Sequence, residues 1–227
     1  MMKNQKKIVQ MFVFFFRFTA RAFLCYNLPM KLIIASNNAH KMREISEILG
    51  AVFPDMVTLK QAGLNIDVVE DGDTFAANAI KKAEEVRLAS GFPAALADDS
   101  GLIVDALDGA PGVYSARYAG EGHNDADNNA KLMRDMAGVP VEQRTCRFAS
   151  AVALARDGKE TICVMGYAEG ILLTEARGAN GFGYDPYLFF PPLGKSFAEL
   201  SAQEKNSVSH RKHALEALLD VLRQEQE

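Results

Sequence analysis

After a divergent first segment, the pattern of apolar and polar residues begins with a strand, a turn and a helix. Residues 31–35 (KLIIA) form a short apolar run of strand type. The polar turn 36–38 (SNN) follows, and residues 39–49 then place apolar side chains at helical spacing. Ser36 or one of the two asparagines is expected to cap this helix, because their side-chain oxygens can accept hydrogen bonds from first-turn amides.

Strands and helices keep mixing along the rest of the chain. Strands are expected at 52–59, 94–97, 102–107, 145–155 and 161–168, with 170–173 extending the last, and helices at 74–90, 127–136 and 207–223. The polar turn 156–159 (RDGK) between two β-type runs indicates a hairpin. Hairpins beside strand–helix units predict an α/β fold with a mixed sheet rather than a purely parallel one.

Residues 1–29 do not continue this pattern. They contain no Asp or Glu, and their apolar run, 8–16, is shorter than the ~20 residues of a membrane span. A signal peptide, an organellar transit peptide and translation from Met30 all fit this composition, and Met30 directly precedes the first strand. We therefore treat 1–29 as an extension outside the fold and 30–227 as a single domain.

Charge and cysteine usage narrow the function classes. The formal net charge is −4, and the five basic residues of the first thirty leave −9 on the remainder. So acidic a body argues against a non-specific nucleic-acid binder, which needs a basic face. Cys25, Cys146 and Cys163 lack metal-ligand spacing and are expected to be free thiols of a cytoplasmic protein that is not bound to a membrane.

Acidic residues in two separate segments suggest a metal site. Glu70 lies in the polar loop 67–73, and Asp98 and Asp99 are expected at the end of a strand. Neighbouring strand residues point to opposite faces, so one aspartate would face a cleft while the other supports the turn. Carboxylates from two segments suit Mg²⁺ that also takes substrate phosphate oxygens, and one of them could deprotonate a water. A solvated acidic loop is the alternative.

Three further segments carry candidate chemistry. Residues 36–41 (SNNAHK) present a helix N-terminus and a lysine, which suits phosphate, although an ordinary capped helix has the same pattern. Residues 181–186 (GFGYDP) combine close backbone approach with stacking faces, or form a tight turn with core aromatics. Lys205, His210 and Arg211 precede or open the last helix and offer donors to a base or phosphate.

Taken together in this order, these motifs closely resemble the inosine triphosphate pyrophosphatase family of noncanonical purine nucleotide hydrolases. The segments that carry the resemblance are 36–41, 70–75, 97–102, 109–117, 181–186 and 209–211, within a match from Met30 to about Leu222. The resemblance implies hydrolysis of ITP, dITP and XTP to the monophosphate and pyrophosphate, with Mg²⁺ as cofactor. It also implies a homodimer and an elongated mixed β-sheet flanked by helices, with two lobes and a central nucleotide-binding cleft.

The resemblance also implies roles for individual residues. Asp99 would be the base, and Glu70 and Asp99 would bind Mg²⁺, with Lys82 adding charge near phosphate. The expected substrate-binding residues are Ser36, Asn37, Asn38, Ala39, His40, Lys41, Ser100, Phe182, Gly183, Tyr184, Asp185, Lys205, His210 and Arg211. Of these, 36–41 would hold the triphosphate, and His210 and Arg211 would read the purine edge.

One position departs from the family pattern. Ala77 stands where the family often has glutamate, in the run Phe75-Ala76-Ala77-Asn78-Ala79. Two rival interpretations follow from the sequence: a Maf-like pyrophosphatase acting on modified pyrimidine nucleotides, and a nucleotide sensor without turnover. The segments 181–185 and 209–211 argue against the first, and the pair Glu70 and Asp99 argues against the second.

Overall fold

The computed structural model describes residues 30–120 and 124–225, so the expected extension 1–29 lies outside the described residues. Seven strands form one mixed sheet in the order β2-β1-β3-β4-β5-β6-β7. The strands are β1 (Leu32–Ile34), β2 (Met56–Thr58), β3 (Ala94–Val104), β4 (Thr145–Arg156), β5 (Ile162–Leu172), β6 (Leu188–Phe190) and β7 (Lys195–Ser196). β1 runs parallel to β2 and β3, and all later neighbours are antiparallel. The predicted mixed α/β sheet is confirmed.

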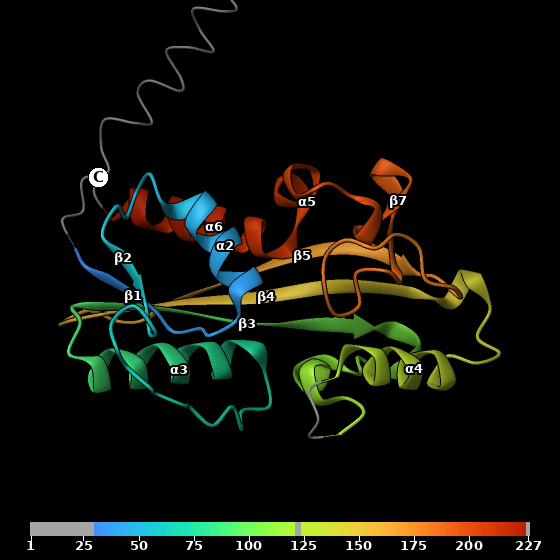
Figure 1. Cartoon of the computed structure of the whole chain (residues 1–227), viewed down its shortest axis with the longest axis horizontal. Coiled ribbons are helices and arrows are strands. Elements are labelled where there is room, and N and C mark those ends of the chain that lie inside the picture. The colour runs from blue at the N-terminus through green and yellow to red at the C-terminus, as the bar shows by residue number, and fades with distance from the viewer. Residues whose placement is uncertain (1–29, 121–123, 226–227) are drawn as a thin grey trace, which may run out of the picture.

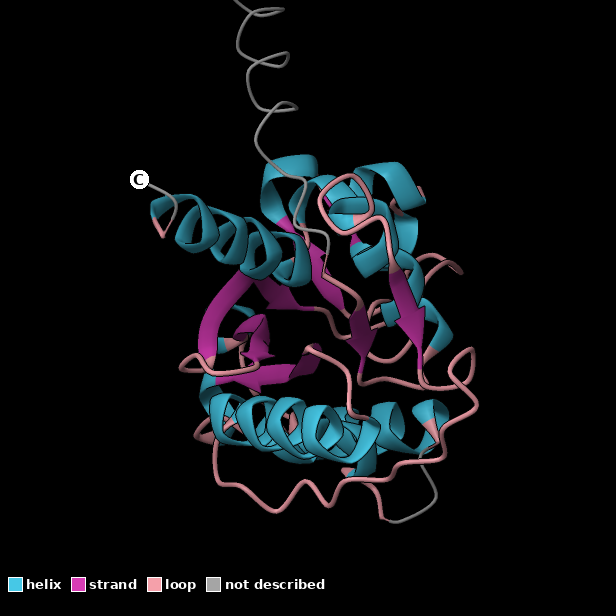
Figure 2. Cartoon of the chain, turned by 90° about the vertical axis from the view of Figure 1, so that its left-hand side faces the viewer, coloured by secondary structure: helices cyan, strands magenta, loops and turns pink. Residues whose placement is uncertain are grey.

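Helices cover both faces of this sheet (Figures 1 and 2). The helices are α2 (Ala39–Leu49), α3 (Phe75–Ser90), α4 (Asp125–Asp135), α5 (Ala202–Val208) and α6 (His210–Gln224). In Figure 1, α2, α5 and α6 lie above the sheet, and α3 and α4 lie below it. α2 and α6 bury leucines and isoleucines on the upper face, whereas α3 packs small side chains against a row of sheet alanines. None of the helices in 30–120 and 124–225 is long and apolar enough to cross a membrane.

The central strand β3 differs from the prediction. Two strands, 94–97 and 102–107, were expected with a break at the aspartates, but one strand continues from Ala94 to Val104. β3 pairs with β4 along its whole length, including Asp98 opposite Val152 and Asp99 opposite Ala151. The two aspartates therefore lie within a strand and point to opposite faces, and the expectation that they end it is wrong.

The last helix is also divided, contrary to the single helix expected over 207–223. Ser209 has extended backbone angles (φ −73°, ψ 152°), and its side chain accepts from the Lys212 amide as the N-cap of α6. α6 packs directly on β5, because Gly166 has no side chain: a Cβ there would lie 2.2 Å from the His210 carbonyl oxygen. This close approach fixes the first turn of α6 beside the sheet.

Candidate active site

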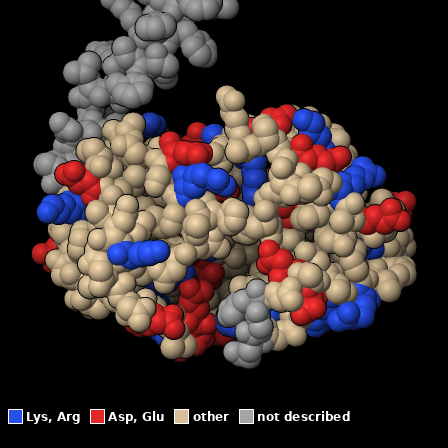
Figure 3. Space-filling view, viewed as in Figure 1, with Lys and Arg blue, Asp and Glu red and all other residues tan. Residues whose placement is uncertain are grey.

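A cleft opens where the edge of β3 loses its neighbour. On β3, β1 pairs only with Ala94, Ala95 and Leu96. Beyond Leu96, no named strand of the described chain covers this edge of β3. A cavity of about 620 Å³ lies at this edge. Side chains from both faces of the sheet can reach it there, as expected where parallel strands end. Figure 3 shows the molecule hollowed near the middle of this face, with acidic side chains gathered below.

The structure brings most of the predicted site residues to this cavity. Among its lining residues are Ser36, Asn37, Asn38, Lys41, Glu70, Lys82, Asp99, Ser100, Phe182, Gly183, Tyr184, Asp185, Lys205, His210 and Arg211. Two predicted residues, Ala39 and His40, are not in the lining. His40 instead stacks on the ring of Phe182, with 4.9 Å between the ring centroids.

The turn 36–38 begins α2 as a capped helix, with Asn38 as its cap. The Asn38 side chain accepts from the amides of His40 (2.9 Å) and Lys41 (3.1 Å), and the Asn38 amide donates to Ser36 Oγ (3.2 Å). The positive end of the helix, Asn37 and the Lys41 ammonium face the cavity. This corner is suited to an anionic group such as phosphate.

On the upper face of β3, Asp98 is the centre of a buried ion network. Its carboxylate lies 2.7 Å from Lys41 Nζ and 3.2 Å from an Arg211 nitrogen, and it accepts from the Ser150 hydroxyl. Burial alone would raise the pKa of Asp98, but Arg211 and Lys41 outweigh burial and hold it well below its usual range. Asp98 therefore anchors two cleft cations in the ionised form, and it does not support a turn as expected.

On the lower face, Asp99 meets a different environment. The residue is 6% exposed, and its carboxylate accepts from the Asn78 side-chain amide at 3.0 Å. Burial raises the pKa of Asp99 to about 6; Lys41 opposes this rise and Glu70 adds to it. Asn78 is itself fixed, because its oxygen accepts from the Gly72 amide at 2.8 Å. Asp99 is thus a buried carboxylate with a proton affinity suited to exchange near neutral pH.

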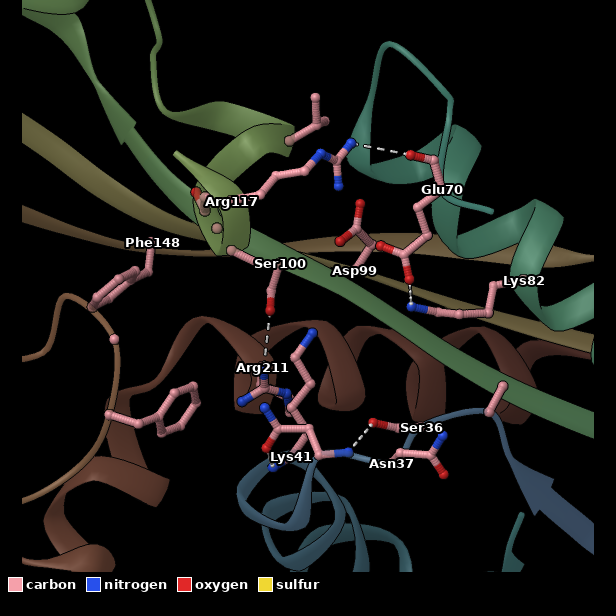
Figure 4. Close-up of a pocket in the computed structure, with 18 of the residues that line it drawn as sticks. Ser36, Asn37, Lys41, Glu70, Lys82, Asp99, Ser100, Arg117, Phe148 and Arg211 are labelled. Atoms are coloured by element: carbon pink, nitrogen blue, oxygen red, sulfur yellow. Dashed lines mark hydrogen bonds and ion pairs between the residues drawn. The ribbon is translucent and has the colours of Figure 1, made fainter. Parts of the chain in front are cut away.

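Glu70 and Asp99 form the donor set that would suit a divalent ion. Figure 4 shows the Glu70 side chain directed towards Asp99, with Lys82 hydrogen-bonded to Glu70. Within 30–120 and 124–225 no group of three or more His, Cys, Asp or Glu side chains forms a complete metal cage. Two oxygen donors suit Mg²⁺, which keeps water and takes phosphate oxygens as its other ligands.

The loop 181–186 forms the opposite wall and is held from several sides. The Gly183 amide donates to Asp125 (2.7 Å), and its carbonyl oxygen accepts from Asn129 (2.9 Å). The Phe182 amide donates to Asp185 (2.9 Å), which Lys205 Nζ approaches to 2.6 Å. The backbone of Gly183 is therefore already engaged, and the loop presents the Phe182 ring rather than free amides.

His210 and Arg211 lie at the first turn of α6, deep in the cleft. Arg211 is fully buried and donates to Asp98, to Glu44 and, at 3.1 Å, to Ser100 Oγ. Burial and, secondarily, the Arg211 charge hold the pKa of His210 well below its usual range, so its imidazole is neutral. His210 Nδ1 is buried and has no hydrogen-bond partner among the described residues. The residue itself is part of the cavity lining.

Four site residues were missed by the sequence analysis. Glu44 pairs with Arg211, Asn78 holds Asp99, Asp125 holds Gly183, and Arg117 lines the cavity beside Glu70. Glu44 has a weak sequence signal, because it follows Lys41 by three residues on the same helical face. Ala77, by contrast, is exposed and is not in the cavity lining.

Comparisons with known proteins agree with this geometry. The Ham1 family model matches residues 32–221. A dITP/XTP pyrophosphatase of Clostridium perfringens is 48% identical over 198 residues, covering 85% of this chain and 97% of that protein. One from Leuconostoc mesenteroides is 49% identical over 191 residues, covering 83% and 94%. The structure of the Staphylococcus aureus Ham1 protein matches with a TM-score of 0.77 at 38% identity, covering 86% of this chain and 98% of that one.

Proposed function

The chain belongs to the Ham1 family, and we infer that it hydrolyses noncanonical purine nucleoside triphosphates, namely ITP, dITP and XTP, to the monophosphate and pyrophosphate. The observation that carries this proposal is the open edge of β3. A helix N-terminus with Lys41 lies on one side of it, and the carboxylates of Glu70 and Asp99 lie on the other. A triphosphate spanning that edge would meet anion-binding groups and a metal site together.

The phosphates would lie between the two faces of β3. Ser36, Asn37, Asn38 and Lys41 would hold the triphosphate at the start of α2, with Ala39 and His40 shaping that turn from outside the cavity. Glu70 and Asp99 would bind Mg²⁺, which supplies charge neutralisation at the phosphates. Asp99 accepts the proton of the water that attacks the α-phosphorus, and pyrophosphate leaves. Asp99 is placed for this role by its position at the cavity beside Glu70, where its carboxylate accepts from Asn78.

The purine would lie against the wall formed by 181–186 and the first turn of α6. Phe182 offers a stacking face, Tyr184 and Asp185 keep the loop in place, and Lys205 lies 4.6 Å from the Phe182 ring centroid. His210 Nδ1 and a remaining Arg211 nitrogen proton would read the 6-keto edge, which adenine lacks. Ser100, bonded to Arg211, would contact the nucleotide beside them.

Further features of the proposal rest on the family resemblance, which implies the homodimer, and on the acidic charge and the cysteine spacing of the sequence. We propose that the protein acts in the cytoplasm as a homodimer and does not bind nucleic acid or membranes. Sedimentation at micromolar concentration tests the dimer, and a mass of one chain would contradict it.

The proposed activity is tested by product analysis. The protein is incubated with Mg²⁺ and ITP, dITP, XTP, GTP or ATP, and pyrophosphate, phosphate and the nucleotide products are separated. The proposal predicts pyrophosphate and monophosphate from ITP, dITP and XTP, with far less from GTP and ATP. Orthophosphate and a diphosphate as products, or binding of ITP without cleavage, would contradict it, and the latter would favour a nucleotide sensor.

A further inference from the structure

The cations that line the cleft differ in whether they are already neutralised. Four of them form ion pairs with carboxylates: Lys41 with Asp98, Lys82 with Glu70, Lys205 with Asp185 and Glu44, and Arg211 with Asp98 and Glu44. The fifth, Arg117, makes no ion pair with any residue of 30–120 or 124–225. A triphosphate brings about four negative charges, so a cation that is not yet neutralised is the one most available to it.

Arg117 is held in place by neutral groups. It ends the short helix Gly112–Arg117, and its Nη2 donates to the Glu70 carbonyl oxygen at 3.2 Å. The guanidinium carbon lies 5.2 Å from the centroid of the Tyr114 ring. The side chain is half-buried, and Figure 4 shows it reaching over the space beside Asp99 and Glu70. One backbone contact and one ring orient the guanidinium and leave most of its donors for a ligand.

We propose that Arg117 binds the departing diphosphate of the substrate and neutralises the charge that it gains in the transition state. This inference rests on the proposed pyrophosphatase activity. In that reaction the oxygen of water bonds to the α-phosphorus, the bond from the α-phosphorus to the bridging oxygen breaks, and Asp99 takes the water proton. The electron pair of the broken bond stays on the diphosphate. Arg117 lies beside Glu70, on the metal side of the β3 edge that the triphosphate would span, where it can reach that group.

A guanidinium suits this position for two reasons. It presents paired donors that match two phosphate oxygens, which one ammonium group cannot do. It also retains its charge, whereas the nearby Lys82 ammonium already pairs with Glu70. The contact is expected to strengthen as charge moves to the leaving group, so it should raise kcat more than it lowers KM.

The test compares Arg117→Gln and Arg117→Lys with the unmodified protein and with a matched control, Arg134→Gln. Arg134 is an exposed arginine in the last turn of α4, outside the cavity lining, so the control removes the same charge. The first readout is the affinity for inorganic pyrophosphate in the presence of Mg²⁺, by calorimetry. The second is kcat and KM for ITP, and the third is product inhibition by pyrophosphate and by IMP.

Arg117→Gln is expected to weaken pyrophosphate binding about tenfold or more and to lower kcat for ITP about ten- to a hundredfold, with KM nearly unchanged. For Arg117→Lys, the pyrophosphate affinity and kcat should lie between those of Arg117→Gln and the unmodified protein. Inhibition by IMP should be unchanged in both Arg117 variants. Arg134→Gln should match the unmodified protein. The proposal is overturned if Arg117→Gln binds pyrophosphate normally, or if it weakens IMP and pyrophosphate equally, as a displaced loop would do.

The same experiment separates this inference from the function on which it rests. If the unmodified protein fails to release pyrophosphate from ITP, XTP and dITP, the proposed function fails. The pyrophosphate affinities still report directly on Arg117 in that case, because they need no turnover.

Discussion

Asp99→Asn is expected to stabilise the metal-free protein while removing its activity. Burial raises the pKa of Asp99 from 3.8 to about 6, and each pKa unit corresponds to about 1.4 kcal/mol. The ionised carboxylate therefore lowers the free energy of unfolding by up to about 3 kcal/mol near neutral pH. Asparagine keeps the shape and can still accept from Asn78, but it carries no charge to desolvate.

The raised pKa of Asp99 also determines how the stability difference between Asp99→Asn and the unmodified protein changes with pH. A carboxyl group whose pKa is raised by folding costs no stability below the pKa of the unfolded chain. Its cost grows as the pH rises from that value to the folded pKa and is constant above it. The advantage of Asp99→Asn should therefore grow from ~1 kcal/mol near pH 4.5 to ~3 kcal/mol near pH 8. Mg²⁺ should narrow this gap, because it stabilises only the protein that retains both carboxylates.

The neighbouring residue provides a control of opposite sign. The pKa of Asp98 is held well below its usual range: Arg211 and Lys41 outweigh burial. Asp98→Asn leaves the buried Arg211 and the half-buried Lys41 without their shared partner and should destabilise the fold by about 3–5 kcal/mol near neutral pH. Denaturant unfolding of both variants in chelator, at the two pH values, checks this pair. The reasoning is refuted if Asp99→Asn destabilises the protein, or if its effect does not change between the two pH values.

The remaining predictions concern the cleft wall, the packing of α6 and the metal. Asp125→Ala removes the acceptor of the Gly183 amide and should raise KM for ITP about tenfold. Asp125→Asn should recover most of this loss, and the control Asp127→Ala, which removes an exposed carboxylate from the same helical turn, should have no effect. Equal losses in all three variants would contradict this role of Asp125. Gly166→Ala places a Cβ against the His210 carbonyl oxygen and should cost about 1–3 kcal/mol in denaturant unfolding, and an unchanged midpoint would show that α6 moves freely. A chelator should abolish pyrophosphate release from ITP and Mg²⁺ should restore it, and turnover that persists in chelator would refute the metal site.

Local patterns in the sequence were enough to predict the elements that place the phosphate corner. The apolar spacing of residues 39–49 matches α2, and one of the asparagines before it does cap the helix. The hairpin around 156–159 is also confirmed by β4 and β5. These features depend on residues close together in the chain, so the sequence carries their signal.

The interior of β3 could not be predicted in this way. Two adjacent aspartates, a serine and a glycine are typical of a strand end or turn, because buried carboxylates need partners. The charged partners of Asp98 are Lys41 and Arg211, and the Asp99 carboxylate accepts from Asn78. These three partners lie on other elements than β3, and Arg211 is 113 residues from Asp98 along the chain. Only tertiary structure supplies these contacts, and they allow the strand to continue.

The same reason explains which site residues were missed. The predicted ones lie in short motifs whose residue types suit phosphate, metal or a base. Glu44 and Asn78 lie inside helices with apolar faces, where a single polar residue has no recognisable function until its partner is seen. Their roles are to hold Arg211 and Asp99 in position.

The most direct test of the account is the fate of the water oxygen. ITP is hydrolysed with Mg²⁺ in ¹⁸O-labelled water, and the products are analysed by mass spectrometry. The account predicts one labelled oxygen in IMP and none in pyrophosphate, because water attacks the α-phosphorus beside Asp99. Label in the pyrophosphate, or in released orthophosphate, would contradict it.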